Sequence, residues 1–210
     1  MTGLEDHIRI VKQRFNHAYM GYTEMFTMLN EQVGCGHVAE VGIGLLDTAI
    51  WTAPLIASRK GHLYLIDSFK GRITPGCYDW YADVNDDDRL SFTIEAMTPY
   101  AEHVTIIRAD LTTAEGCQIV DDAIPAASLS MVMLDAAHDV ASVIRDHALM
   151  LPKVKLDGMI AVHDWDEDPG HRGVKDAVQA IRGQELVGVK ERRDGMQLGQ
   201  HGGTAFWTRS

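Results

Sequence analysis

Residues 38–49 read VAEVGIGLLDTA, and this stretch decides the fold. An apolar run carries Glu40, glycines follow at Gly42 and Gly44, and a helical pattern begins near Thr48. Glycine lets the backbone turn tightly and come close to a ligand. The sequence therefore predicts a strand, a ligand-binding turn and a helix in succession.

Short apolar runs rich in branched residues alternate with helical patterns after this turn. The alternation predicts a parallel sheet that helices cover on both faces. One or two amphipathic helices are expected over 4–29, and a closing pair of strands at 185–193 and 203–210. The core strands are expected at 37–43, 62–67, 103–110, 129–135 and 158–164, and the helices at 48–59, 86–98, 113–122, 139–151 and 172–183, with Pro54 kinking or delaying the first helix.

The composition bounds the domain count and the partners. The chain has 210 residues, 46% of them hydrophobic, which predicts a single domain over 1–210. Its 19 basic and 30 acidic residues give a formal charge of -11, which argues against nucleic acid or an anionic membrane as a partner. Three scattered cysteines predict no disulfide framework, and no stretch reads as a signal peptide or a membrane span. A soluble, cytoplasmic protein is expected, and whether it forms a homo-oligomer stays open.

Four of the five core strands end at or near an aspartate. Open parallel sheets bind their ligands at the carboxyl edge of the strands. An unpaired carboxylate buried at that edge is unfavourable, so the acids call for a shared partner. The alternative is that each acid only caps the next helix. The four residues are Asp67, Asp110, Asp135 and Asp164.

The glycine turn lacks the third glycine of a dinucleotide site. Asp47 stands at that position, where it would face a pyrophosphate. Glu40, two residues before the first glycine, suits a ligand with an ammonium group and an adenosine, and S-adenosylmethionine has that chemistry. Asp67 is placed to accept hydrogen bonds from the ribose hydroxyls, and Asp110 to receive the adenine amino group.

The sequence resembles the class I S-adenosylmethionine-dependent methyltransferases over about residues 35–209. The motifs DSFKG at 67–71, LDAAHD at 134–139 and AVHDW at 161–165 are similar to those of small-molecule O-methyltransferases of the macrocin and cephalosporin-tailoring type. Catechol O-methyltransferase is a more distant relative. The resemblance implies a Rossmann-like, doubly wound α/β sheet of seven strands, mostly parallel with an antiparallel last strand, and the helices expected over 4–29 would precede it.

The resemblance also implies the cofactor contacts. The glycine turn would line the methionine end of the cofactor, and Thr48 would meet its carboxylate. Leu46 departs from the pattern, because many relatives carry glycine there. The residues expected at the cofactor are Glu40, Gly42, Gly44, Thr48, Asp67, Ser68 and Asp110.

In metal-dependent relatives, an acid ending the fourth strand and two adjacent residues ending the fifth bind magnesium. The resemblance places Asp135, His163 and Asp164 at these positions, where a divalent ion would orient and deprotonate an acceptor hydroxyl. Magnesium prefers oxygen ligands and imidazole favours softer ions. Three interpretations stay open: His163 is not a ligand, the metal is not Mg²⁺, or there is none.

Asp135 and His138 are the expected catalytic residues. His138 falls where the catechol enzymes carry a basic residue, and an imidazole suits a general base near neutral pH. The alternative is that His138 caps the following helix.

These residues together predict a methyltransferase that moves a methyl group to an oxygen of a small-molecule acceptor. The first alternative is an NAD-dependent oxidoreductase on a related fold, and the second is a cofactor-binding module without turnover. Residues 1–34 are expected to form a helical extension. Residues 71–89 are expected to form an acidic, aromatic insertion. This insertion is either a substrate wall or lid, or else an oligomer contact or a partly ordered surface loop.

Overall fold

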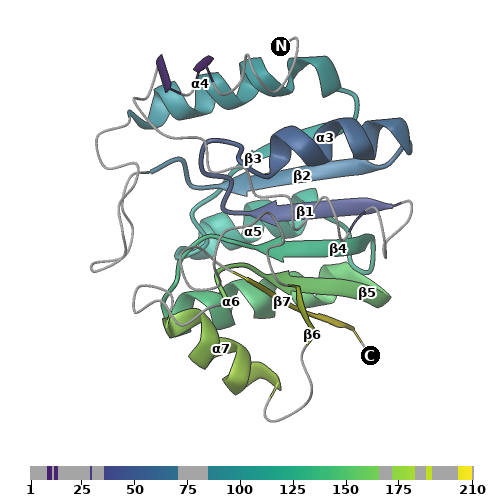
Figure 1. Ribbon diagram of the computed structural model, residues 1–210, viewed down its shortest axis with the longest axis vertical. Coiled ribbons are helices and arrows are strands. Elements are labelled where there is room, and N and C mark those ends of the chain that lie inside the picture. Colours follow the sequence, from purple (N-terminus) through teal and green to yellow (C-terminus); the bar gives the residue numbers. More distant parts are fainter. Residues whose placement is uncertain are drawn as a thin grey trace.

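The computed structural model describes residues 9–10, 12–13, 29, 36–70, 85–165, 172–182, 188–190 and 203–209. The strands within these ranges form one seven-stranded sheet in the order β3-β2-β1-β4-β5-β7-β6 (Figure 1). β7 runs antiparallel to both of its neighbours, and the other pairs are parallel. The strands are β1 (His37–Val41), β2 (His62–Asp67), β3 (Val104–Arg108), β4 (Leu129–Leu134), β5 (Val154–Val162), β6 (Gly188–Lys190) and β7 (Thr204–Thr208).

The helices alternate with the parallel strands as the sequence predicts. Short 3₁₀ turns, η2 (Thr98–Tyr100) and η3 (Leu151–Lys153), lead into β3 and β5. The described α-helices that connect the strands are α3 (Ala49–Ser58), α4 (Asp86–Met97), α5 (Ala114–Ala123), α6 (Val140–Met150) and α7 (Arg172–Arg182).

The expectation that Pro54 delays the first of these helices is wrong. α3 begins at Ala49 and contains Pro54 in its interior. The carbonyl of Thr48 already accepts hydrogen bonds from the amides of Trp51 and Thr52, at 3.1 and 3.2 Å. The first turn is therefore closed before the proline, whose missing N–H affects only a later turn.

Two apolar clusters lie on the two faces of the sheet. α3 and α4 pack on one face, and α5, α6 and α7 pack on the other (Figure 1). Successive strand residues point to opposite faces, and in β1 Val38 belongs to the first cluster while Ala39 and Val41 belong to the second. The expected helical cover on both faces is confirmed.

The strand register brings the site residues to one edge. Val41 pairs with Ile66 and with Leu134, and Leu134 pairs with Val162. The strand order reverses between β1 and β4, which is where open α/β sheets bind ligands. The residues that follow these four paired positions are Gly42, Asp67, Asp135 and His163.

Several expectations fall partly outside the described residues. Within 4–29, the structure describes Arg9, Ile10, Lys12 and Gln13 as helical, and it also describes Leu29. Of the insertion expected at 71–89, residues 71–84 lie outside the described part, while 86–89 form the first turn of α4 rather than an insertion. No helix among the described residues is long and apolar enough to cross a membrane.

Candidate active site

The glycine turn after β1 adopts the strained backbone that its sequence indicates. Gly42 and Gly44 have φ angles of 84° and 49°, and a Cβ on Gly42 would lie 2.2 Å from the carbonyl oxygen of Asp135. Leu46 also has a positive φ of 69°. This left-handed conformation favours glycine, so Leu46 is strained at this position.

Asp67 at the end of β2 is tied to the glycine turn and to a buried arginine. Its Oδ2 accepts a hydrogen bond from the amide of Ile43 at 3.1 Å, and its Oδ1 accepts one from the amide of Phe69 at 2.6 Å. Arg89 of α4 donates to Oδ2 at 3.1 Å, and the Arg89 residue is only 4% exposed. Oδ1 keeps acceptor capacity for a ribose hydroxyl.

Sequence reasoning missed Arg89, although its spacing carried a signal. The buried face of α4 includes Arg89, Phe92, Thr93 and Ala96, at i, i+3, i+4 and i+7. An arginine that begins an apolar stripe is buried with a partner. Its guanidinium also lies 3.4 Å from the carbonyl oxygen of Gly44, so it joins the glycine turn to the end of β2.

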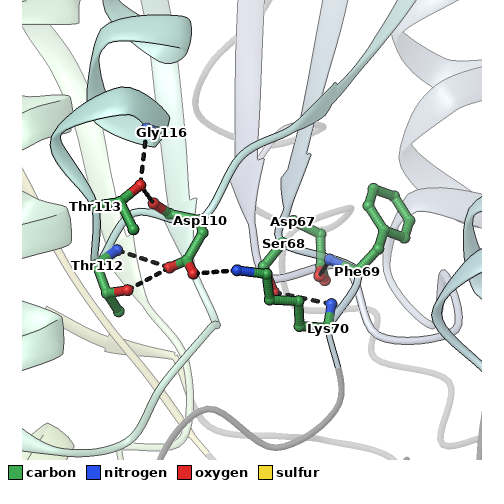
Figure 2. Close-up of polar contacts among 8 residues, drawn as sticks. All are labelled: Asp67, Ser68, Phe69, Lys70, Asp110, Thr112, Thr113 and Gly116. Atoms are coloured by element: carbon green, nitrogen blue, oxygen red, sulfur yellow. Dashed lines mark hydrogen bonds and ion pairs between the residues drawn. The ribbon is translucent and has the colours of Figure 1, made fainter.

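Asp110, two residues beyond β3, is held by its neighbours (Figure 2). Its Oδ2 accepts a hydrogen bond from the Lys70 ammonium at 2.7 Å, and its Oδ1 accepts from the Thr112 amide and hydroxyl at 3.0 and 2.5 Å. The Lys70 hydrogen bond, followed by that of the Thr112 hydroxyl, lowers the pKa of Asp110 to about 2. Asp110 is therefore an ionised acceptor at any working pH.

The ends of β4 and β5 bring an imidazole between two carboxylates. His163 is 3% exposed, and its Nδ1 lies 3.3 Å from Oδ1 of Asp135 and 3.1 Å from Oδ1 of Asp164. Burial alone would lower the pKa of His163, but the two carboxylates hold it well above the ordinary value. His163 is thus a protonated cation within the site, and Asp164, with a positive φ of 59°, is strained beside it.

His138 pairs with the other oxygen of Asp164. Its Nε2 lies 2.9 Å from Oδ2 of Asp164. Burial lowers the pKa of His138, but the hydrogen bond and charge of Asp164 outweigh that effect and raise it. Burial likewise opposes ionisation of Asp164, yet His163 and His138 hold its pKa well below the usual range.

The His138 loop is fixed by two contacts with neighbouring helices. Asp139 caps α6 by accepting a hydrogen bond from the amide of Ser142 at 3.0 Å. Gly173 of α7 packs so closely that a Cβ there would lie 2.2 Å from the carbonyl oxygen of His138. His138 is therefore not the cap of α6, and its side chain remains available to the site.

The other helix caps exclude the alternative that the strand-end acids only cap helices. The caps of α4 and α5 are Asn85 and Thr113, which accept backbone amides through their side chains. α7 begins at Arg172, eight residues beyond Asp164. None of the four acids is the N-cap residue of α4, α5 or α6, so their placement at one edge needs another explanation.

Glu40 of β1 is buried at the same site. It is 1% exposed, and its Oε2 has no hydrogen-bond partner among the described residues. Burial, followed by the charges of Asp135 and Asp47, raises the pKa of Glu40 well above its ordinary value. A buried acid of this kind is neutral until a cation approaches.

A small hollow lies beside His163 and His138, and it is lined by Asp135, His138, His163 and Asp146 among others. Burial raises the pKa of Asp146 to about 6, although Arg145 donates to it at 3.0 Å. Sequence reasoning missed Asp146 because it lies inside α6 rather than at a strand end.

The other expected site residues lie at the same edge of the sheet. Thr48 is buried and makes no side-chain capping bond to α3. Ser68 accepts a hydrogen bond from the amide of Lys70 at 3.1 Å. Among the described residues, one set of possible metal-ligand atoms lies within 4.8 Å, and it contains His138 rather than His163: Asp135, His138 and Asp164.

Comparisons with known proteins agree with this architecture. The model of a family of methyltransferase domains matches residues 39–165. A SAM-dependent O-methyltransferase from Thermotoga maritima has a TM-score of 0.61 and 13% identity over 97% of this chain and 71% of that chain. An rRNA methylase from Streptococcus thermophilus has a TM-score of 0.53 and 12% identity over 84% of this chain and 87% of that chain.

A third structure, a methyltransferase-type protein from Streptococcus mutans in complex with SAH, has a TM-score of 0.51 and 9% identity over 81% of this chain and 86% of that chain. At these identities the likeness shows the fold alone. No curated protein matches the chain. The mostly parallel, Rossmann-like methyltransferase fold expected from the sequence is confirmed.

Proposed function

The chain belongs to the family of methyltransferase domains, and we propose that it moves a methyl group from S-adenosylmethionine to an oxygen of a small-molecule acceptor. The observation that carries the proposal is the 2.9 Å contact between His138 and Asp164 at the carboxyl ends of β4 and β5. A base that a carboxylate orients is what an acceptor hydroxyl needs before it attacks. A tailoring enzyme of the macrocin type fits this chemistry.

His138 acts through the nitrogen that Asp164 leaves unused. With Nε2–H donated to Asp164, the lone pair of Nδ1 takes the proton of the acceptor hydroxyl. The cofactor supplies a sulfonium methyl that needs only an oriented nucleophile. As the oxygen forms its bond to the methyl carbon, the carbon–sulfur bond breaks and its electron pair returns to sulfur, so charge and atoms balance.

The groups at the carboxyl ends of β1 and β2 support the choice of S-adenosylmethionine as the cofactor. The glycine turn brings the backbone close, the free capacity of Asp67 Oδ1 suits a ribose hydroxyl, and Glu40 offers a buried acceptor to a cationic group. The cofactor carries both an ammonium and a sulfonium. Asp47 argues against the pyrophosphate of a nicotinamide cofactor.

Metal assistance is a second candidate that one observation favours, namely the ligand set of Asp135, His138 and Asp164. Two carboxylates and one imidazole suit manganese, iron or zinc better than magnesium. A bound ion would lower the pKa of the acceptor hydroxyl. In this variant His163 is not a ligand, because the set of ligand atoms that lie close together contains His138 instead.

The charge of the chain favours a small acceptor over RNA, although an rRNA methylase shares the fold. A formal charge of -11 repels a phosphate backbone at long range. The acceptor is then a neutral or cationic molecule with a free hydroxyl. Binding of a short RNA by the chain at physiological salt would contradict this part of the proposal.

The first experiment is a calorimetric titration of metal-stripped protein with S-adenosylhomocysteine, with NAD as the control. We expect micromolar binding of S-adenosylhomocysteine and no heat with NAD. Repeating the titration with magnesium and with manganese tests the metal variant. Binding of NAD in place of S-adenosylhomocysteine would make the oxidoreductase alternative the better one, and binding without any turnover in the next experiment would favour the non-catalytic module.

The second experiment screens hydroxyl-bearing small molecules for methyl transfer by mass spectrometry. We expect a mass gain of one methylene on an oxygen, and loss of that gain in His138→Gln. If the activity survives chelation, His138 removes the proton of the acceptor hydroxyl without help from a metal ion. Activity that returns only with an added ion assigns the ligand role to Asp135, His138 and Asp164.

A further inference from the structure

The carboxylate of Asp110 has little acceptor capacity left for a cofactor base. A carboxylate oxygen has about two acceptor sites, and Thr112 fills both on Oδ1 with its amide and hydroxyl. Lys70 takes one of the two on Oδ2, at 2.7 Å (Figure 2). The ammonium thus stands where the amino group of an adenine would need to bind.

The backbone of Lys70 is fixed, but its side chain is not. The Lys70 amide donates to Ser68, and the Lys70 carbonyl accepts from the buried Arg89 at 3.4 Å. The Lys70 side chain is 56% exposed and carries a flexible four-carbon stem. The ammonium can therefore leave Asp110 without a change in the backbone that Arg89 holds.

Asp110 itself cannot follow the ammonium. Its carboxylate is locked to Thr112, and its backbone is held by α5, because Thr113 donates to the Asp110 carbonyl at 2.9 Å and a Cβ on Gly116 would lie 2.1 Å from that oxygen. After Lys70 leaves, the amide and hydroxyl of Thr112 still donate to the carboxylate and stabilise its ionised form. The carboxylate of Asp110 is therefore held in place, whereas the ammonium of Lys70 can move.

We propose that Lys70 is a gate of the nucleoside subsite: its ammonium closes on Asp110 in the empty protein and yields that place to the amino group of adenine. The inference rests on the proposed S-adenosylmethionine cofactor. With Lys70 on Asp110, a purine that carries an oxo group instead of the amino group is tolerated, because the ammonium donates to the oxygen. Lys70 therefore weakens the affinity for adenine and broadens the choice of base.

The test compares two ligands that differ in this one group. S-adenosylhomocysteine and its hypoxanthine analogue, S-inosylhomocysteine, are titrated calorimetrically into the wild type, Lys70→Met and Lys155→Met. Lys155 is exposed and follows the start of β5, at the opposite edge of the sheet, so it controls for the loss of one positive charge. Thermal unfolding verifies that each variant is folded.

We expect Lys70→Met to bind the adenine ligand about two- to fivefold more tightly than the wild type, the range set by a partly exposed ion pair that no longer competes. The same variant should bind the hypoxanthine ligand more weakly, because an oxo group then faces a bare carboxylate. Lys155→Met should match the wild type for both ligands. In an Asp110→Asn background, Lys70→Met should change neither affinity.

Weaker or unchanged binding of the adenine ligand by Lys70→Met would overturn the gate, as would an equal change for both ligands or an effect that persists in Asp110→Asn. These outcomes leave the cofactor assignment intact, because the wild type still binds. If no protein of the set binds S-adenosylhomocysteine, the proposed function fails and the gate fails with it.

Discussion

The two halves of the site pair their carboxylates with different cations. The acids that end β2 and β3 face an arginine and a lysine, and the acids that end β4 and β5 face two histidines. Arginine and lysine stay charged throughout the working pH range, whereas imidazole titrates near neutrality. The first half is thus suited to hold a cofactor with constant charge, and the second half to exchange protons with a substrate.

The largest expected effect comes from removing the buried cation of the arginine and lysine half. Arg89→Met leaves the carboxylate of Asp67 buried without its cation, and loss of one partner of a buried pair costs about 3–5 kcal/mol. Urea unfolding measures this loss. The matched control is Arg108→Met, whose exposed pair with Asp87 is 3.4 Å long and should contribute less than about 1 kcal/mol. Equal losses in the two variants would show that Arg89 is not a structural counterion.

The second effect is a fall of stability with rising pH, to which the histidine half contributes through the raised pKa of His163. Because the pKa of His163 is raised, the folded chain keeps a proton that the unfolded chain releases above about pH 6.5. Stability from this group is full below that pH and falls as the pH rises through the raised pKa, by up to about 1.4 kcal/mol per pH unit. Glu40, whose pKa is also raised, adds to the decline from about pH 4.5 upward.

Urea unfolding from pH 4 to pH 9 measures this decline, and His163→Gln should flatten it above pH 6.5. The arginine and lysine half behaves oppositely, since the pKa of Asp110 is lowered to about 2. Its contribution is full above about pH 4 and is lost only toward pH 2. A wild-type stability that stays constant from pH 6 to pH 9 would contradict the protonated state of His163.

The third effect is a loss of turnover from a substitution that alters no charged residue. Gly173→Ala places a methyl group against the carbonyl of His138, which must then shift. A displacement of about 1 Å costs on the order of a hundredfold in rate, while the affinity for S-adenosylhomocysteine should stay unchanged. Gly158→Ala, which crowds Val154 at the other sheet edge, is the control and should lower stability without a selective loss of turnover.

The smallest effect is a shift in one titration curve. Asp164→Asn removes the hydrogen bond and charge that raise the pKa of His138, so burial should leave that pKa lower than in the wild type. NMR titration of the histidine ring protons in chelator-treated protein measures it. Asp139→Asn keeps the cap of α6 and removes a neighbouring charge, so an equal shift in both variants would contradict a specific role of Asp164.

Hydrophobic periodicity was enough to predict the layers of the fold. The predicted helix at 86–98 is Asp86–Met97 in the structure, and the strand predicted at 62–67 is His62–Asp67. β5 begins at Val154, earlier than the predicted 158, because the charged, irregular stretch at 155–157 breaks the apolar pattern that marks a strand. Periodicity reports burial, so it misses strand residues that lie at an exposed end.

The site could be predicted only for residues that end strands. Asp135, His138, His163 and Asp164 follow two neighbouring strands, and the parallel register alone brings them together. Arg89 and Lys70 pair with acids 22 and 40 residues away, and such pairing depends on how α4 and the chain after β2 fold back over the edge. The spacing within α4 indicates that Arg89 is buried but does not identify its partner, and no local pattern marks Lys70, so both pairs were missed.

We assign separate roles to the two halves of the site. The most direct test is the steady-state kinetics of His138→Gln with an acceptor from the screen. His147→Gln, in the helix α6 that follows His138, is the control. We predict that His138→Gln lowers kcat by about 10²–10⁴-fold and leaves KM for S-adenosylmethionine unchanged, while His147→Gln alters neither. A raised KM for S-adenosylmethionine with an intact kcat in His138→Gln would contradict the account, because His138 would then bind the cofactor rather than move the proton.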